Sequence, residues 1–216
     1  MKIFLDTADV DGIRRAAATG LVDGVTTNPS HISKTGRRFQ DVVLEICEIL
    51  PRGAISVEAV GDNAEDLIKE AQKISALAPN IVVKIPMGIE GLKAVPVLTK
   101  EHKIRTNLTM TFSSTQVFLA MKAGTTFVSI VLSRLDAIAS ESIVLLQDAV
   151  TIKKNFGFES EVLAASLKTQ NHVLAALRAG VDIITVPDSL FFQMYQHPLT
   201  DAALAQFDID WAKVRK

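Results

Sequence analysis

Short apolar segments alternate with longer amphipathic segments along most of the chain. The apolar segments predict eight strands, at residues 2–6, 24–27, 54–59, 81–86, 104–109, 127–131, 161–166 and 183–187. The segments between them have helical spacing, as in residues 63–77, where the apolar positions keep one face. Two of these helices end in Ala-Gly, at Gly124 and Gly180, and glycine directly after a helix is a common stop signal. The pattern is typical of an α/β protein.

Eight strands separated by helices fit either a closed (β/α)8 barrel or an open doubly wound sheet. An open dinucleotide-binding sheet usually has a glycine-rich first turn, but here the first strand is followed by DTADVDG, and the chain contains no P-loop. The number of strands and the length of 216 residues therefore favour a TIM barrel. We expect one domain over residues 1–216, in which residues 198–216 or so form a C-terminal helical tail.

Composition and charge narrow the classes of partner. Hydrophobic residues make up 48% of the chain, charged residues 22%, and the net charge is -1. Without a basic block, we expect neither nucleic acid nor an anionic membrane as a partner. No apolar run approaches the ~18 residues of a transmembrane helix. The N-terminal MKIFLDTADV has an acid within a short apolar run, so we expect no signal peptide and a cytoplasmic protein.

The cysteine and the histidines show no pattern of metal ligands. Cys47 lies on the apolar face of a predicted helix, which favours core packing over reactivity, and a lone cysteine forms no internal disulfide. His31, His102, His172 and His197 show no ligand spacing with one another or with Cys47. We therefore interpret the histidines as loop or helix-surface residues and predict no metal site.

Polar residues recur at the carboxyl ends of the predicted strands, where (β/α)8 barrels build their active sites. The set is Asp6, Thr26, Asn28, Glu58, Lys84, Asn107, Thr109, Ser129, Arg134, Ser166 and Lys168. Taken singly, each has a simpler interpretation: helix or turn capping for Asp6 and Asn28, a surface ion pair with Asp136 for Arg134, and a solvated loop position for Lys168. Because the whole set converges on one opening, it predicts a single polar site.

Lys84 lies in the middle of the apolar strand at residues 81–86. One interpretation is a buried salt bridge with Glu58 or Asp6. The other is a nucleophile: burial disfavours the charged ammonium, and the neutral amine attacks a carbonyl to form a Schiff base. The iminium then serves as an electron sink for making or breaking the adjacent carbon–carbon bond. That chemistry needs no metal and no organic cofactor.

Schiff-base chemistry requires further groups. Imine formation expels water, and Glu58 is placed to act as its acid–base group through a water also held by Thr109. Cleavage of a β-hydroxy imine needs a base for the hydroxyl proton, and Asp6 is the other carboxylate at the rim. Barrels often bind phosphate with residues from the last strands and their loops. Three residues suited to binding an anion lie in that part of the chain: Arg134, Ser166 and Lys168.

Eight segments, spread in order over almost the whole chain, resemble the motifs of the transaldolase family in its small, single-barrel branch. They are FLDTAD (4–9), GVTTNPS (24–30), SVEAV (56–60), VVKIP (82–86), TNLTMTFSSTQ (106–116), SRLD (133–136), LAASLKT (163–169) and ITVP (184–187). The resemblance implies a class I aldolase on a (β/α)8 barrel, with Lys84 as the Schiff-base lysine and Asp6 as the acid–base residue of carbon–carbon cleavage. It also implies that Glu58 and Thr109 hold the water of imine formation.

The resemblance implies substrates and binding residues as well. Asn28, Asn107 and Ser129 would bind the hydroxyls of a dihydroxyacetone unit. The phosphate of the sugar would be held by Arg134, Ser166 and Lys168.

Two activities occur in this branch. Transaldolases move a dihydroxyacetone unit from sedoheptulose 7-phosphate to glyceraldehyde 3-phosphate, whereas fructose-6-phosphate aldolases release free dihydroxyacetone. Glu58 is the residue that the resemblance associates with transaldolases, since the aldolases have glutamine there. Ile130 and Val131 depart from the family, which usually has proline and then an aromatic residue, tyrosine in the aldolases. We expect a transaldolase, with a fructose-6-phosphate aldolase or a catalytically silent sugar-phosphate-binding protein as alternatives.

The C-terminal segment HPLTDAALAQFDIDWAKVRK has many apolar residues for a tail beyond the eighth strand. One interpretation is a last helix packed on its own barrel. The resemblance implies instead a helix exchanged between neighbouring subunits of a ring-built homo-oligomer, a decamer or pentamer. The residues themselves indicate only that the tail has apolar surface to bury.

Overall fold

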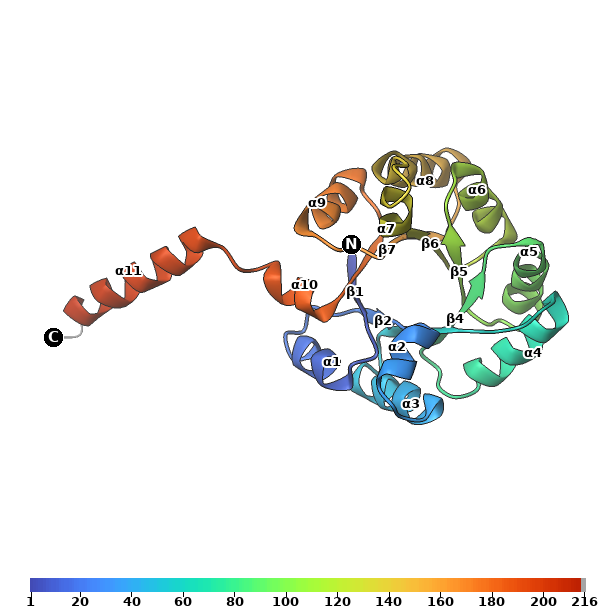
Figure 1. Ribbon diagram of the computed structural model, residues 1–216, viewed down its shortest axis with the longest axis horizontal. Helices are drawn as coiled ribbons and strands as arrows, with labels where there is room; N and C mark the ends of the chain where they lie inside the picture. Colours follow the sequence, from blue (N-terminus) through green and yellow to red (C-terminus); the bar gives the residue numbers. More distant parts are fainter. Residues whose placement is uncertain (215–216) are drawn as a thin grey trace.

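The computed structural model describes residues 1–214 of the chain and shows a closed barrel of eight parallel strands (Figure 1). Neighbouring strands pair in chain order, and β8 closes the barrel on β1. The strands are β1 (Lys2–Asp6), β2 (Gly24–Thr26), β3 (Ala54–Glu58), β4 (Ile81–Pro86), β5 (Thr106–Thr111), β6 (Phe127–Val131), β7 (Glu161–Ala165) and β8 (Ile183–Val186). The predicted (β/α)8 barrel is confirmed, and the open sheet is excluded.

The fifth strand differs most from its prediction. It was expected at residues 104–109, but β5 begins at Thr106 and continues to Thr111. The register against β6 shifts between Leu108 and Thr111, and Met110 has a left-handed backbone with φ of 64°. A bulge of this kind inserts an extra residue into a strand and turns its end, which is a feature of tertiary pairing rather than of the apolar pattern.

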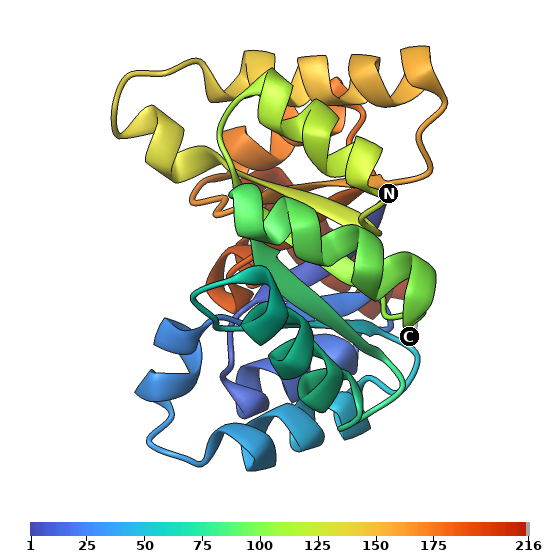
Figure 2. The same ribbon diagram turned by 90° about the vertical axis from the view of Figure 1, so that its right-hand side faces the viewer.

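Helices surround the barrel, as Figure 2 shows for α4, α5 and α6 on one side. They are α1 (Val10–Ala17), α2 (Pro29–Lys34), α3 (Phe39–Ile49), α4 (Ala64–Ser75), α5 (Ile89–Pro96), the π-helical η1 (Val97–Glu101), α6 (Ser114–Ala123), α7 (Leu132–Asp136), α8 (Ser142–Phe156), α9 (Gln170–Ala179), α10 (Asp188–Gln193) and α11 (Pro198–Val214). The predicted stops at Gly124 and Gly180 are confirmed, because both glycines cap helices in the left-handed conformation. None of the helices in residues 1–214 combines the length and apolar character needed to cross a bilayer.

Large apolar side chains fill the lower part of the barrel interior. They come from inward-facing positions of five strands and are Phe4, Val82, Phe127, Leu163 and Ile183. The rings of Phe4 and Phe127 meet edge to face, with centroids 5.9 Å apart. A Cβ at Gly24 would lie 2.8 Å from Cε1 of Phe4 and 2.4 Å from the Ala54 carbonyl oxygen, so only glycine fits there. This apolar layer seals the end of the barrel opposite the predicted site.

A second core lies between the strands and the surrounding helices. Cys47 of α3 belongs to it and is buried, so the predicted core packing is confirmed. Burial raises the pKa of the Cys47 thiol to about 11, with a smaller contribution from Glu48. The thiol therefore stays protonated at neutral pH and behaves as a small apolar side chain.

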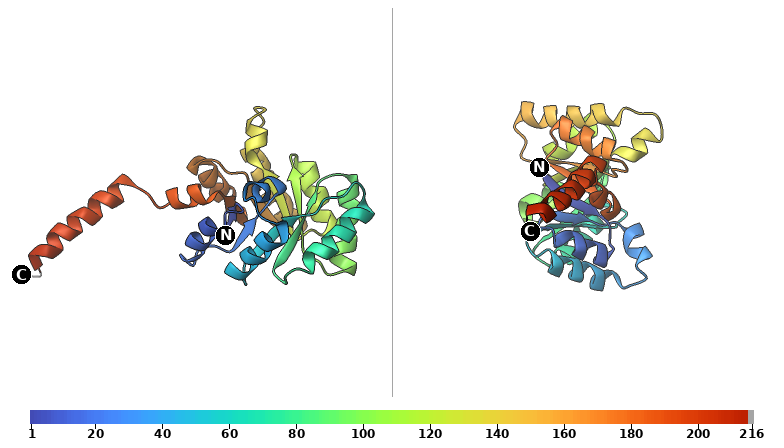
Figure 3. Two further views of the ribbon diagram at one scale, coloured as in Figure 1. Left: turned by 60° about the horizontal axis from the view of Figure 1, so that its bottom comes forward. Right: turned by 90° about the vertical axis from the view of Figure 1, so that its left-hand side faces the viewer.

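The last helix, α11, points away from the barrel (Figures 1 and 3), and none of its residues is buried. Large apolar side chains including Leu199, Phe207 and Trp211 are more than half exposed. The interpretation that this helix packs on its own barrel is therefore wrong for the described residues. Residues 215 and 216 of the predicted tail lie outside the described part of the chain.

The lower apolar layer leads to a test of stability. We expect Phe4→Ala to lower the free energy of unfolding by about 3–5 kcal/mol, since it opens a cavity in a closed interior. Tyr195→Ala, at a side chain that is 71% exposed, should change it by less than about 0.5 kcal/mol. Urea denaturation monitored by circular dichroism measures both. Equal stability of the two variants would contradict this account of the barrel interior.

Candidate active site

A cavity of about 580 Å³ opens at the carboxyl ends of the strands. Nine of the eleven predicted site residues line it: Asp6, Thr26, Asn28, Glu58, Lys84, Thr109, Ser129, Arg134 and Ser166. The other two, Asn107 and Lys168, lie beside it. The closed barrel therefore brings together residues from seven strands and the turns that follow them, over a sequence span of 160 residues.

Lys84 is buried at the floor of this cavity, with 8% of its surface exposed. Its Nζ lies 2.7 Å from Oε2 of Glu58 and donates a hydrogen bond of 3.0 Å to the carbonyl oxygen of Thr27. Glu58 and Lys84 are direct neighbours in the register of β3 and β4, which places both side chains on the same inner face. The predicted salt bridge is present and joins Lys84 to Glu58 rather than to Asp6. It leaves the nucleophilic interpretation open, because Glu58 is also positioned to accept a proton from the ammonium.

Asp6 is held at the end of β1 by side chains from neighbouring elements. Thr26 Oγ1 donates a hydrogen bond of 3.0 Å to Asp6 Oδ1, and Thr26 is in turn 2.7 Å from Oγ1 of Thr185. The Nδ1 atom of His31 lies 3.9 Å from the same carboxylate oxygen. The Asp6 carboxylate therefore faces the cavity from a fixed position.

Asn107 lies beneath the cavity floor, where it is fully buried. Its Oδ1 accepts a hydrogen bond of 2.6 Å from Ser129, and its Nδ2 donates one of 3.2 Å to Ser56. Ser129 reaches both Asn107 and the cavity. Every buried polar side-chain atom in residues 1–214 has a hydrogen-bond partner, so this polar layer is internally satisfied.

Asn28 caps helix α2 and also lines the cavity. Its Oδ1 accepts a hydrogen bond of 2.9 Å from the backbone N–H of His31, so the capping interpretation is confirmed. The cap and Pro29 set the direction of α2, and that direction turns residue 31 back over the end of β1. Position 31 lies one turn from a cap beside the site, and this spacing is the sequence signal for the contact.

His31 is not a loop or helix-surface residue, and that interpretation is wrong. Its side chain is 23% exposed, faces Asp6 and lines the cavity. Burial lowers the pKa of His31 below its ordinary value; the Asp6 carboxylate acts to raise it, and Lys34, Lys84 and Lys168 act with burial to lower it.

Two of the three predicted anion-binding residues, Arg134 and Ser166, line the cavity. Ser166 has a left-handed backbone with φ of 59°, and its Oγ lies 2.6 Å from Oγ of Ser133. Arg134 lines the cavity from α7. Asp136 lies 3.3 Å from His172 Nε2 and accepts a hydrogen bond from Ser142; the surface ion pair with Arg134 does not form among the described residues.

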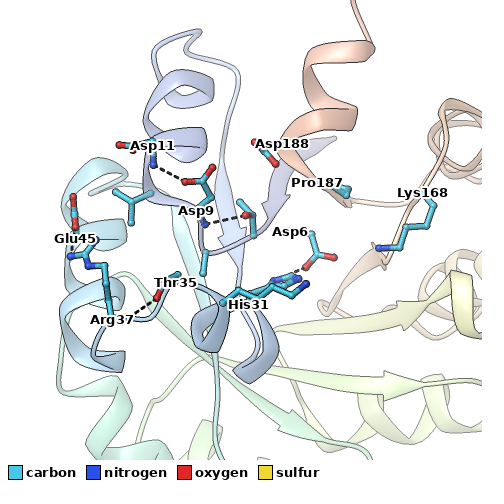
Figure 4. Close-up of a pocket in the computed structure, with 14 residues that line it drawn as sticks. Asp6, Asp9, Asp11, His31, Thr35, Arg37, Glu45, Lys168, Pro187 and Asp188 are labelled. Carbon is cyan, nitrogen blue, oxygen red and sulfur yellow. Dashed lines mark hydrogen bonds and ion pairs between the residues drawn. The ribbon is translucent and has the colours of Figure 1, made fainter.

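Lys168 extends over a second cavity that adjoins the first (Figure 4). This cavity, also of about 580 Å³, shares Asp6, His31 and Lys34 with the first. Lys168 is exposed, and its backbone N–H donates to His172. No group of three or more histidine, cysteine or acidic side chains in residues 1–214 is arranged to hold a metal ion.

Comparison with known proteins identifies the family. The model of the family Transaldolase/Fructose-6-phosphate aldolase matches residues 3–216. The chain belongs to this family. A protein of Herpetosiphon aurantiacus named "Probable transaldolase" is 51% identical over 99% of this chain and 96% of its own. Proteins with the same name from Thermoanaerobacter sp. and Geobacter metallireducens are each 48% identical, over 99% and 100% of this chain and 98% and 100% of their own. The resemblance found in the motifs is confirmed, and the protein is an enzyme of this family.

The buried layer beneath the cavity leads to a second test. We expect Asn107→Leu to destabilise the fold by about 1–3 kcal/mol for each serine hydroxyl that it leaves without a partner. The matched control is Asn171→Leu, at an exposed position of α9, which should be close to neutral. Urea denaturation compares the two. If Asn107→Leu were as stable as the wild type, the hydrogen bonds would not hold the cavity floor.

Proposed function

We propose that this protein is a transaldolase that works through a Schiff base on Lys84. It transfers a dihydroxyacetone unit from a ketose phosphate, sedoheptulose 7-phosphate or fructose 6-phosphate, to an aldose phosphate, glyceraldehyde 3-phosphate or erythrose 4-phosphate. The observation that supports this most is the buried Lys84–Glu58 pair at the cavity floor, with the Asp6 carboxylate in the wall of the same cavity.

Glu58 prepares the nucleophile. At 2.7 Å it accepts a proton from the Lys84 ammonium, and the neutral amine attacks the carbonyl carbon of the ketose. Loss of water from the carbinolamine then needs a proton on the departing oxygen, which Glu58 returns through a water that Thr109 also holds. Thr109 is buried and lines the cavity on β5, the strand paired with β4.

Asp6 carries the proton of the carbon–carbon step. It removes the proton of the hydroxyl that lies β to the iminium carbon, and the electrons of that O–H bond form the carbonyl of the leaving aldose. The electrons of the carbon–carbon bond move into an enamine on Lys84. When an aldose acceptor binds, these steps run in reverse. The enamine attacks the aldehyde carbon, and Asp6 returns the proton to the oxygen that becomes the new hydroxyl.

The remaining polar residues hold the sugar. Asn28 and Ser129 line the cavity, and Asn107 orients Ser129 from below through their 2.6 Å hydrogen bond. Together they bind the hydroxyls of the dihydroxyacetone unit, with Thr26 beside Asp6. The phosphate lies toward Arg134, Ser166 and Lys168, where backbone and guanidinium donors suit its geometry.

Two features favour transfer over release of free dihydroxyacetone. The first is the glutamate at position 58, which the resemblance to the family associates with transaldolases rather than with the aldolases. The second is that relatives from three bacteria are named "Probable transaldolase". Val131 lies in the cavity wall, at the position where the resemblance places a tyrosine in the aldolases, and the lack of that tyrosine argues against the aldolase. We further propose a cytoplasmic protein that forms a homo-oligomer, a decamer or pentamer as the resemblance implies. In it, the exposed apolar side chains of Leu199, Leu204 and Phe207 on α11 would pack against a neighbouring subunit.

Trapping of the imine tests the nucleophile. We expect borohydride reduction with fructose 6-phosphate to trap an iminium on the peptide that contains Lys84, mainly as the three-carbon dihydroxyacetone unit that remains after cleavage, as peptide mass spectrometry would show. Lys84→Met should lose the adduct and at least about 10³-fold of the transfer rate, because the covalent route is closed. Lys122→Met, at an exposed position of α6, is the control and should keep both. An adduct on another residue would refute this mechanism.

An acceptor-dependence assay tests transfer against release. With fructose 6-phosphate alone we expect little free dihydroxyacetone, because the enamine on Lys84 waits for an aldehyde; adding erythrose 4-phosphate or glyceraldehyde 3-phosphate should start turnover. Release of dihydroxyacetone without acceptor, at a rate similar to transfer, would indicate a fructose-6-phosphate aldolase. Tight sugar-phosphate binding without turnover would indicate a silent binding protein.

A further inference from the structure

The catalytic cavity and the cavity beside it share Asp6, His31 and Lys34 in their walls. The second cavity is otherwise lined largely by segments that the proposed mechanism does not use, among them the turn into α1 and the start of α10 (Figure 4). Lys34, the lysine among the shared residues, comes from the end of α2 and belongs to neither the catalytic set nor the phosphate-binding set proposed above. Its side chain therefore lies where the two cavities meet, beside Asp6.

The short helix α2 directs Lys34 toward this opening. Ile32 is buried and anchors the helix on the core, whereas His31 and Lys34, three residues apart, lie on the same side of the helix. The end of the helix is fixed as well. Thr35 Oγ1 donates a hydrogen bond of 2.7 Å to the carbonyl oxygen of Ile32, and the backbone N–H of Arg37 donates one of 3.2 Å to Thr35 Oγ1. The backbone of Lys34 is thus held in place, while its side chain is exposed and accessible to a ligand.

The cations around the two cavities fall into a paired and an unpaired group. Arg37 lies 2.8 Å from Oε2 of Glu45, and Lys84 lies 2.7 Å from Oε2 of Glu58. Three other cations in the cavity walls form no ion pair within residues 1–214: Lys34, Arg134 and Lys168. A paired cation has much of its field cancelled by its partner, whereas an unpaired one attracts an anionic ligand with its full charge.

The carboxylates of the second cavity are engaged by groups other than Lys34. Asp9 caps α1 by accepting a hydrogen bond from the backbone N–H of Asp11. Asp188 lies 3.9 Å from Arg15, and Glu45 lies between Arg14 and Arg37. These contacts direct the acidic groups away from the ammonium of Lys34.

Lys168 approaches the same opening from the other end of the chain. Figure 4 shows its side chain directed from the turn after β7 toward Asp6 and His31. Lys34 and Lys168 are both close enough to His31 for their charges to act on that ring and lower its pKa. Two unpaired ammonium groups from different elements therefore lie near one point, at the edge of the catalytic cavity.

We propose that Lys34 is a substrate-binding residue that selects phosphorylated sugars, through contact of its ammonium with the phosphate of the donor and of the acceptor. A sugar phosphate is a dianion, and several unpaired cations around one opening provide the charge that recognises it. Arg134 offers a planar fork of fixed geometry, whereas Lys34 offers a point charge on a flexible stem, which can follow the phosphates of sugars of different length. The role rests on the proposed transaldolase function and adds a residue to its phosphate site.

Lys34→Gln and Arg37→Gln form a matched pair, since each replaces one cation in the wall of the second cavity by the same neutral side chain. For Lys34→Gln we expect the KM for fructose 6-phosphate and that for erythrose 4-phosphate each to rise roughly 10-fold. The kcat should stay within about 3-fold, because phosphate binding is lost equally from the ground state and the transition state. Lys34→Arg, which restores a cation, should bring both KM values to within about 3-fold of the wild type. For Arg37→Gln, whose charge Glu45 already balances, we expect KM values within about 2-fold of the wild type.

A ligand without phosphate separates phosphate recognition from a general effect on the site. Dihydroxyacetone contains the three carbons that bind Lys84 and no phosphate. We expect borohydride to trap it on Lys84 of Lys34→Gln to the same extent as on the wild type.

The outcomes decide the proposal. Unchanged KM values in Lys34→Gln would overturn it, and so would an equal rise in Arg37→Gln, because the loss of any nearby positive charge would then explain the effect. Loss of dihydroxyacetone trapping in Lys34→Gln would also overturn it, since Lys34 would then act on imine formation or on the fold. Failure of the wild type to form an adduct at Lys84 would instead refute the proposed function, so the two failures are distinguishable.

Discussion

An ammonium group buried inside a closed barrel needs hydrogen-bond acceptors and a negative charge close to it, and the residues around Lys84 supply both. Lys84 finds two: the Glu58 carboxylate at 2.7 Å and the carbonyl oxygen of Thr27 at 3.0 Å. A buried charge without such partners costs several kcal/mol. Pairing Glu58 directly opposite Lys84 in adjacent parallel strands supplies the carboxylate through sheet register alone. In the proposed mechanism, the same pair provides the nucleophile and the base that accepts its proton.

The layer beneath this pair explains how the barrel tolerates polarity in its centre. Barrel interiors are usually filled by branched apolar residues, but here the middle positions are fully or almost fully buried polar residues that bond to one another: Thr26, Ser56, Asn107, Ser129 and Thr185. Below them, the layer that contains Phe4 and Phe127 is apolar and tightly packed. The polar residues therefore lie on a packed apolar layer, and their hydrogen bonds continue to the cavity, from Thr26 to Asp6 and between Asn107 and Ser129.

Much of this arrangement could be predicted from the chain, and the failures have physical causes. Strand positions followed from short apolar runs, and nine of the predicted site residues line one cavity, since the carboxyl ends of barrel strands must meet. The extra residues of β5 depend on a bulge at Met110, which pairing with β6 creates. The contact of His31 with Asp6 depends on the direction of α2, which a cap at Asn28 sets. The pattern of apolar residues along the chain predicts neither the position of the bulge nor the direction of the helix.

The sequence by itself determined the fold class, the family and most of the polar residues that line the cavity, because strand periodicity and residue type are local properties. Only the tertiary structure decided which carboxylate pairs with Lys84, that Asn107 lies under the floor rather than in it, and that α11 leaves its own barrel. These depend on register, barrel closure and the angle at which short helices leave the strands. Such quantities arise from distances between residues far apart in the chain, and no single segment encodes them.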